Sequence, residues 1–358
     1  MKHLLTMVHI SDLHFGDIAP DGDSKLESEA PGWWRHCSFF NGYLGHHAAA
    51  LVDFADAFDK LQNDNDKLLL FITGDFTATG SLSQFDNAQE YLRKHIGEIG
   101  TYGPVGLELN YNPYAMNSVP GNHDHWPGNS FIFGKPDGLR SYYPGPVPPA
   151  SSGLPIPIKV VTLNDSRSTR LSIAGIDTSA EVSPYGFNRI AARGHFVEQL
   201  KTLKSQWGPW RKGELRMLLM HHSPLARERY TCCLSGASRR VLEEFIRQLR
   251  VSIILTGDVH TPQGEILQQK YRTSSWPMVE ARCGTTLQRD EVPASFIAPW
   301  LSMQRKFDVN TFLVHKLFED NGTIKWKCKV FWRLSGGFAE KGWLEDKDGY
   351  PIYMRTLT

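Results

Sequence analysis

Five short polar segments of this 358-residue chain carry side chains that commonly bind metals. They are Asp12-Leu13-His14, Gly74-Asp75, Gly121-Asn122-His123-Asp124, His221-His222 and Gly257-Asp258-Val259-His260. Together they supply carboxylates, imidazoles and an amide oxygen, and no cysteine accompanies them. A mixed oxygen and nitrogen donor set suits Mn, Fe or Zn better than calcium or thiolate-bound zinc. The segments therefore predict a site for divalent transition metals.

Each of the five segments is a weak indication by itself. Gly-Asp is a common turn dipeptide, so a structural role accounts for most such pairs. However, every segment directly follows a predicted strand, and ligands of α/β sheets bind at the carboxyl ends of strands. Segments far apart in the sequence can therefore converge at one edge of the fold. Their shared position favours a common site over five unrelated turns.

The sequence around these segments alternates predicted strands with predicted helices. Strands are expected over 4–10, 67–73, 115–119, 159–164, 171–176, 215–220 and 251–256, and helices over 48–61, 83–96, 194–207 and 238–249. The run 67–73 is largely apolar, which is typical of a strand covered on both faces. Near the C-terminus, 310–318 and 323–332 flank Asp320-Asn321-Gly322, a strong hairpin signal. Alternating elements followed by strands predict a layered α/β fold.

Composition excludes several classes of protein. A hydrophobic share of 41% is too high for a disordered chain. The formal net charge of +1 gives no global field to attract nucleic acid, so a nucleic-acid partner is not favoured. Five cysteines form no disulfide framework, and no segment approaches the ~20 apolar residues of a membrane helix. We expect a cytoplasmic protein without a membrane partner; the oligomeric state stays open.

The five segments, in this order, resemble the signature of the calcineurin-like metallophosphoesterase superfamily: Asp-x-His, Gly-Asp, Gly-Asn-His-Asp/Glu, His and Gly-His-x-His. The match runs from about residue 4 to about residue 260, and His221-His222-Ser223-Pro224 is similar to the fourth block of the bacterial cyclic-nucleotide-phosphodiesterase-like branch. The resemblance implies a four-layer α/β/β/α sandwich with two metals at the strand ends. We expect a catalytic domain over 1–300, with 17–47 inserted as a candidate cap, and a β-rich extension over 301–358 that packs on it.

The resemblance also implies a role for each residue. Asp12, His14 and His260 would hold one metal, Asn122, His221 and Asp258 the other, and Asp75 would bridge the two. His222 is the alternative to His221. His123 would face the scissile phosphate, and Asp124 would orient its ring. Asp258 departs from the family pattern, which usually has histidine there; a carboxylate still binds metal, but the exchange leaves metal identity open, with Mn favoured.

These roles predict hydrolysis of a phosphodiester, either a cyclic nucleotide or a related small diester. A metal-bridging hydroxide would attack, and His123 would act as general acid. The alternatives are a nuclease or a phosphomonoesterase or protein phosphatase on the same dinuclear site, or a non-catalytic scaffold. A nuclease should show a basic groove, which the net charge does not predict. A scaffold should have lost several ligands, whereas every position holds a residue able to bind metal.

Overall fold

The computed structural model describes residues 1–18, 28–29, 45–97, 104–112, 117–126, 156–164, 169–180, 196–224, 234, 236–258, 261–266, 278–288, 309–346, 348–352 and 355–357. Three features predicted from the sequence fall wholly or partly outside these ranges. They are His260, most of the 17–47 insertion, and the domain boundary at residue 300. The boundary and the cap therefore stay predictions.

The described residues form two large sheets. The first has the strand order β14-β13-β12-β1-β4-β5, and β15 also pairs with β13. Its strands are β1 (Lys2–Ile10), β4 (Leu68–Thr73), β5 (Ser118–Val119), β12 (Thr311–Asp320), β13 (Thr323–Leu334), β14 (Gly337–Trp343) and β15 (Arg355–Thr356). Strands β1, β4 and β5 are parallel to one another, and β12 joins β1 antiparallel. The C-terminal strands thus extend the sheet that begins with β1.

The second sheet has the order β10-β11-β9-β8-β7-β6. Its strands are β6 (Ile156–Asn164), β7 (Thr169–Gly175), β8 (Glu214–Leu219), β9 (Ile253–Thr256), β10 (Gln263–Ile266) and β11 (Val279–Arg282). The adjacent strands β7, β8, β9 and β11 are parallel to one another, so the loops after β7, β8 and β9 leave the same edge of the sheet. A short separate ribbon pairs β2 (Asp17–Ile18) with β3 (Ser28–Glu29).

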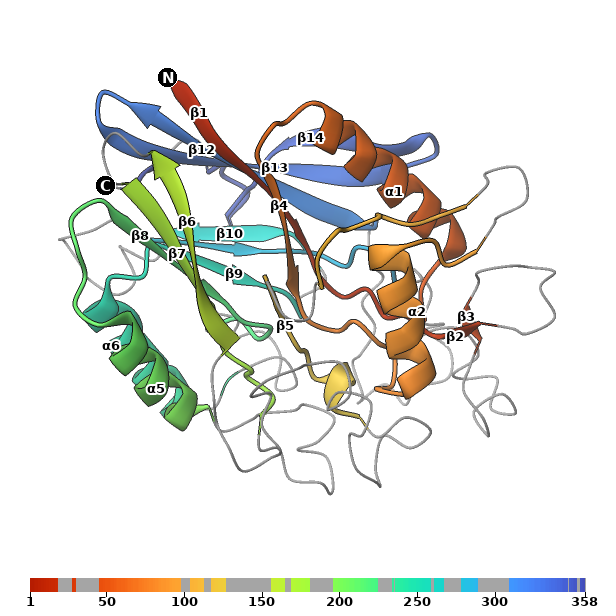
Figure 1. Ribbon diagram of the computed structural model, residues 1–358, viewed down its shortest axis with the longest axis horizontal. Helices are drawn as coiled ribbons and strands as arrows, with labels where there is room; N and C mark the ends of the chain where they lie inside the picture. The colour runs from red at the N-terminus through yellow and green to blue at the C-terminus, as the bar shows by residue number, and fades with distance from the viewer. Residues whose placement is uncertain are drawn as a thin grey trace.

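Helices cover the outer faces of both sheets (Figure 1). Helices α1 (Ala48–Asn63) and α2 (Leu82–Arg93) lie on the first sheet, and α5 (Val197–Trp207) and α6 (Gly236–Leu249) lie on the second. Three apolar cores separate the layers. Phe54 of α1 meets Phe312 of β12 edge-on, Trp207 stacks on Phe245 between α5 and α6, and Trp326 is fully buried between the sheets. The predicted four-layer α/β/β/α sandwich is confirmed.

Local sequence signals account for most of these elements. In α1, the buried side chains Leu51, Phe54 and Phe58 recur at helical spacing. Helix α2 begins after Ser81, whose hydroxyl accepts from the amide of Gln84. The β12–β13 hairpin turns at Asn321 and Gly322, which both have positive φ, as a two-residue hairpin loop of type I′ requires. Within the described residues, no helix is both long and apolar enough to span a membrane.

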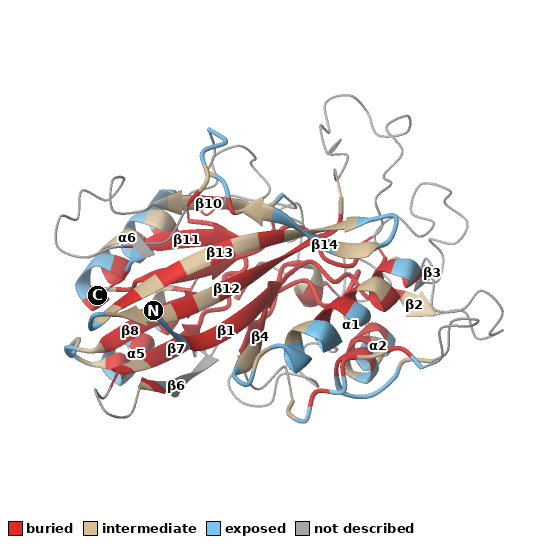
Figure 2. Ribbon diagram, turned by 90° about the horizontal axis from the view of Figure 1, so that it is seen from above, coloured by how far each residue is buried: buried red, intermediate tan, exposed pale blue. Residues whose placement is uncertain are grey.

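Strands β10, β11 and β14 were not predicted. In β11, the sequence Val279-Glu280-Ala281-Arg282 alternates apolar and charged residues, which suggests one dry face and one wet face. All four residues are buried instead (Figure 2). Alternation fails as a guide here because the two charged side chains pair with each other inside the protein.

Candidate metal centre

The polar segments meet where five strands end. Asp12 and His14 follow β1, Asp75 follows β4, Asn122 and His123 follow β5, His221 follows β8, and Asp258 follows β9. Strands of both sheets thus aim their carboxyl ends at one region. All of these side chains are at most 8% exposed except His123, which is partly exposed. His260 lies outside the described residues.

The backbone at the cluster is held in an unusual conformation. Asp12, His14, Asp75 and Asp258 have φ of 54°, 50°, 53° and 63°, in the left-handed region that residues other than glycine rarely occupy. Each such residue costs roughly 1–3 kcal/mol, and residues of this kind gather at functional sites. Backbone hydrogen bonds hold two of these loops together, since the amides of Leu13 and His14 both donate to the carbonyl of Asp75.

Two glycines allow the loops to approach closely. Gly74 has φ of 100°, and a Cβ there would lie 2.5 Å from Nδ1 of His221. A Cβ on Gly121 would lie 2.2 Å from Oδ1 of Asp75. Both distances are well inside van der Waals contact. The glycines of the Gly-Asp and Gly-Asn-His-Asp segments are therefore required by the spacing of the site.

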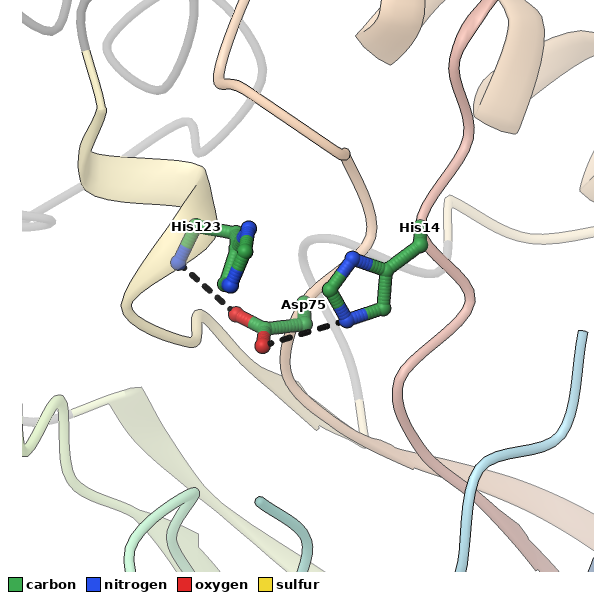
Figure 3. Close-up of side chains that lie close together, drawn as sticks. All are labelled: His14, Asp75 and His123. Carbon is green, nitrogen blue, oxygen red and sulfur yellow. Dashed lines mark hydrogen bonds and ion pairs between the residues drawn. The ribbon is translucent and has the colours of Figure 1, made fainter. Parts of the chain in front are cut away.

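Asp75 occupies the centre of the cluster. Its Oδ2 lies 3.5 Å from Nε2 of His14, and its Oδ1 accepts from the backbone amide of His123 at 2.8 Å (Figure 3). Oδ2 also lies 3.3 Å from Nε2 of His221. Two sets of three residues each have potential ligand atoms that lie within 4.8 Å of one another. One set is His14, Asp75 and His123, and the other set is Asp12, Asp75 and His221. Asp75 belongs to both sets and is therefore their common member.

The tautomer of His221 is fixed by the backbone. Its Nδ1–H donates to the carbonyl of Thr73 at 2.6 Å, which turns Nε2 toward oxygens of three side chains. Nε2 lies 3.3 Å from Oδ2 of Asp75, 3.1 Å from Oδ1 of Asn122 and 3.9 Å from Oδ1 of Asp258. So many electron-pair donors face one another stably only around a proton or a metal cation. Metal-binding histidines typically donate their second N–H to a carbonyl in this way.

His222 lies elsewhere. Its Nδ1 is 2.7 Å from the hydroxyl of Thr178, in the loop after β7. The two adjacent rings meet at 78°, with centroids 5.1 Å apart. Of the pair, His221 is the one whose ring reaches the donor cluster.

Electrostatics also favour a bound cation. Burial raises the pKa of Asp12 to about 7, despite the nearby His221. Burial acts in the same direction on Asp75, but the imidazoles of His221, His123 and His14 outweigh it and hold the pKa of Asp75 well below its usual value. Burial lowers the pKa of His221, but Asp75, Asp258 and Asp12 outweigh it and raise that pKa well above normal. The chain has thus buried three carboxylates that need positive charge beside them.

The donor set therefore fits divalent metals. Asp12, His14, Asp75, Asn122, His221 and Asp258 would hold them, all through oxygen or imidazole nitrogen. The amide of Asp258 also donates to Oδ2 of Asp12 at 3.2 Å, so the loops of both sheets are directly joined.

The ring of His123 is positioned differently from the expectation. Its Nδ1 donates to the carbonyl of Ala78 at 2.8 Å, and the ring packs against Trp126 with centroids 3.8 Å apart. The hydrogen bonds of Asp124 are made with other groups. Its carboxylate accepts from the amides of Phe76, Thr77 and Gly121 and from the hydroxyl of Thr77. Asp124 thus joins the loops after β4 and β5, and the carbonyl of Ala78 orients His123. Burial lowers the pKa of His123, while the nearby Asp75 opposes the shift.

Other residues at the site were missed by sequence reasoning. His125 Nε2 lies 2.9 Å from Oδ2 of Asp177, which links the loop after β5 to the loop after β7. Asp177 and Thr178 follow the predicted strand 171–176, so the strand-end rule that found the other segments could have found them too. Ala78 acts through its carbonyl, for which the sequence carries no signal.

One part of the insertion is described beside the site. His46 is buried, and its Nδ1 accepts from the amide of Gly16 at 3.0 Å. Its ring packs against Phe15, with centroids 5.1 Å apart. His46 therefore anchors the end of the insertion next to the loop that carries Asp12 and His14.

A family model described as calcineurin-like phosphoesterase matches residues 5–262. The match covers more than half of the chain and includes every segment of the cluster. The chain therefore belongs to the calcineurin-like phosphoesterase family, as the sequence motifs predicted. Members of this family are phosphoester hydrolases that use divalent metals.

The structure is similar to several solved structures. GAP50, the anchor in the inner membrane complex of Plasmodium, has 14% identity and a TM-score of 0.46, with 100% of this chain and 89% of that chain covered. A dimetal phosphatase from Danio rerio has 12% identity and a TM-score of 0.45, with 99% of both chains covered. The NAD nucleotidase of Haemophilus influenzae has 15% identity and a TM-score of 0.39, with 94% of this chain and 53% of that chain covered. A comparison with curated proteins finds no match.

Proposed function

We propose that the protein is a dinuclear metal-dependent phosphodiesterase that hydrolyses a small diester, with His123 as the proton donor to the leaving group. The observation that carries this proposal is the position of Asp75. One of its oxygens lies between the imidazoles of His14 and His221, and the other accepts from the amide of His123. A carboxylate in this position is suited to bind a pair of cations next to a substrate phosphate.

The cluster would hold two metals in the manner that the family resemblance implies. Asp12, His14 and His260 would bind one, Asn122, His221 and Asp258 the other, with Asp75 shared. Two such cations supply Lewis acidity to the phosphoryl oxygens and make water a stronger nucleophile at neutral pH. The chain positions these ligands. The carbonyl of Thr73 fixes the tautomer of His221, and Gly74 and Gly121 allow the close approach of the loops that keeps Asp75 between the two groups of ligands.

His123 is positioned to deliver a proton. Because Nδ1–H donates to the carbonyl of Ala78, the proton available for transfer is the one on Nε2 of the imidazolium. The ring packs between His14 and Trp126, with centroids 4.5 and 3.8 Å away, which limits its rotation. An alkoxide leaving group needs such a donor, whereas a good leaving group does not.

The preference for a diester is supported by the resemblance of His221-His222-Ser223-Pro224 to the cyclic-nucleotide branch of the family. Mn is the favoured metal because Asp258 adds a hard carboxylate where the family usually offers imidazole. A cyclic nucleotide or a related small diester is the substrate class we propose.

The proposal is tested with bis-p-nitrophenyl phosphate and p-nitrophenyl phosphate as matched diester and monoester. We expect the Mn-loaded protein to hydrolyse the diester faster, and we expect exhaustive chelation and dialysis to abolish both activities. Adding Mn back should restore them. A panel of 2′,3′- and 3′,5′-cyclic nucleotides and glycerophosphodiesters then identifies the substrate class. Diesterase activity that survives chelation would refute the metal mechanism, and faster monoester hydrolysis would indicate a phosphomonoesterase instead.

A further inference from the structure

Strand β11 carries an ion pair inside the protein, close to the metal centre. Glu280 is fully buried and Arg282 is 5% exposed, and as residues i and i+2 they share one face of the strand. Nη2 of Arg282 lies 3.3 Å from Oε2 of Glu280 and 2.8 Å from Oε2 of Glu265. Its Nη1 donates to Oε1 of Gln263 at 2.6 Å. The arginine thus ties β11 to β10, which starts three residues beyond His260 in the sequence.

The other oxygen of Glu280 contacts two loops of the metal centre. Its Oε1 accepts from the hydroxyl of Ser223 at 2.6 Å and from the hydroxyl of Thr256 at 3.1 Å. Ser223 lies two residues beyond His221, and Thr256 lies two residues before Asp258. The same two loops also meet through the amide of Gly257, which donates to the carbonyl of His221 at 3.0 Å. One carboxylate therefore connects the segments that carry two of the predicted ligands.

A contribution to stability is a weak explanation for a buried ion pair such as Glu280 and Arg282. Taking a carboxylate and a guanidinium out of water is costly, and a well-packed apolar pair of similar volume is often as stable or more so. The geometry here offers more than an apolar pair could, because each hydroxyl is held in one direction by a charge-assisted hydrogen bond. The contacts of Glu280 with Ser223 after β8 and with Thr256 at the end of β9 identify what the pair holds in place.

We propose that Glu280 is a positioning residue of the metal centre. It fixes the loops after β8 and β9 so that His221 and Asp258 keep the spacing that binds the metal they share, and Arg282 balances its charge. This inference rests on the metal centre of the proposed function and not on its substrate. Groups that orient metal ligands in this way typically change metal affinity about 10–100-fold when they are removed.

The same sheet provides a matched control. Glu214 and Arg216 are also residues i and i+2 of one strand, β8, and both are buried, with Nη2 of Arg216 3.1 Å from Oε2 of Glu214. They lie at the amino end of β8, however, and Arg216 donates to the carbonyls of Trp207, Pro209 and Leu249 at the ends of α5 and α6. This second pair has the chemistry of the first, but within the described part of the chain it makes no contact with the metal loops.

The test is a calorimetric titration of the chelator-stripped full-length protein with Mn²⁺, together with thermal unfolding in the absence of metal. We expect Glu280→Gln, Ser223→Ala and Thr256→Val to weaken Mn²⁺ binding at one of two sites, by about tenfold or more for Glu280→Gln. Thr256→Ser keeps the hydroxyl and should retain wild-type affinity. Glu214→Gln should lower the unfolding temperature yet leave Mn²⁺ affinity unchanged.

Three results would overturn the inference. Unchanged Mn²⁺ affinity in Ser223→Ala, Thr256→Val and Glu280→Gln would make the pair purely structural, and so would an equal loss of affinity in Glu214→Gln. The hydroxyl variants keep both charges, so they answer the question even if Glu280→Gln folds poorly. Absence of diesterase activity with the expected Mn²⁺ pattern would reject only the proposed substrate. Failure of the wild-type protein to bind Mn²⁺ would overturn both proposals.

Discussion

Two fully buried histidines, one at the strand ends and one between the sheets, differ in almost everything except their burial. His221 lies among the carboxylates Asp75, Asp258 and Asp12, which raise its pKa well above the usual value in spite of burial. His315 lies on β12 in the core between the sheets, where burial lowers its pKa to about 3. The surroundings of His221 favour a positively charged imidazole, whereas the surroundings of His315 favour the neutral form.

The neighbours of His315 differ from those of His221. Trp326 of β13 donates from Nε1 to Nδ1 of His315 at 3.2 Å, and the ring of His9 from β1 lies 5.5 Å away. His9 is buried too, and burial, with a small contribution from His315, lowers its pKa well below normal. The two buried histidines are therefore distinguished by their partners, which are carboxylates at His221 and an indole N–H at His315. The direction in which the pKa of a buried histidine shifts depends on the groups around it and not on the residue type.

Removing Asp75 should have the largest effect, because it takes away the carboxylate that lies between His14 and His221 and that both proposed metals would share. We expect Asp75→Ala to lower diesterase activity by more than about 10³-fold, beyond the loss of a single transition-state contact, since both cations lose a shared ligand. Metal analysis should show fewer than two bound ions. The control is Asp53→Ala, which removes a carboxylate paired with Arg333 on the outside of the first sheet. Two metals and near-normal rates in Asp75→Ala would contradict the assignment.

His123 provides a third environment, partly exposed and held by a carbonyl. If it protonates the leaving group, His123→Ala should slow diesters with alkoxide leaving groups by about 10²–10⁴-fold. Nitrophenyl diesters should lose far less, because nitrophenolate leaves without a proton. The measurement is the ratio of kcat values for the two substrate types. Equal losses on both would assign His123 to phosphate binding or site geometry.

Substitutions of Asp258 test how far the carboxylates around His221 set the metal preference. Asp258→His exchanges a carboxylate for the imidazole usual in the family, so activity should persist while Zn or Co gains relative to Mn. Asp258→Ala should lower the rate at least about tenfold at limiting metal, with partial recovery at high Mn. Metal stoichiometry and Mn titrations separate these outcomes. Wild-type affinity for two metals in the alanine variant would make Asp258 a turn residue only.

His315 should have the smallest effect, on stability and its pH dependence. The unfolded chain binds a proton at His315 as the pH falls through about 6.5, whereas the folded chain does so only near pH 3. In that window the unfolded state holds more protons, so stability falls as the pH falls, by up to about 1.4 kcal/mol per pH unit. In His315→Gln this contribution is absent, so the decline below pH 6.5 should be shallower. Urea unfolding of metal-free protein at pH 7.5 and 5.5 measures it, and parallel declines would contradict the pKa of His315.

The sequence allowed much of the fold to be predicted. The predicted strand 67–73 and helix 48–61 agree closely with β4 and α1, because continuous apolar runs and helical spacing are local signals. The Asn321-Gly322 turn predicted the hairpin of β12 and β13 for the same reason. Strand β11 was not predicted, and the burial of both its faces depends in part on the pairing of Arg282 with Glu265 on β10, which leaves no local pattern in the sequence.

The sequence by itself determined which residue types gather at the strand ends, because alternating strands and helices bring the ends of parallel strands to one edge. Only the tertiary structure decided how those side chains are aimed. It turned His221 rather than His222 into the cluster, and it gave His123 the carbonyl of Ala78 in place of Asp124. These choices depend on distances of a few ångströms between loops of neighbouring strands and, for His221, between the two sheets. Such distances are fixed by how the layers pack, which motifs along one chain do not encode locally.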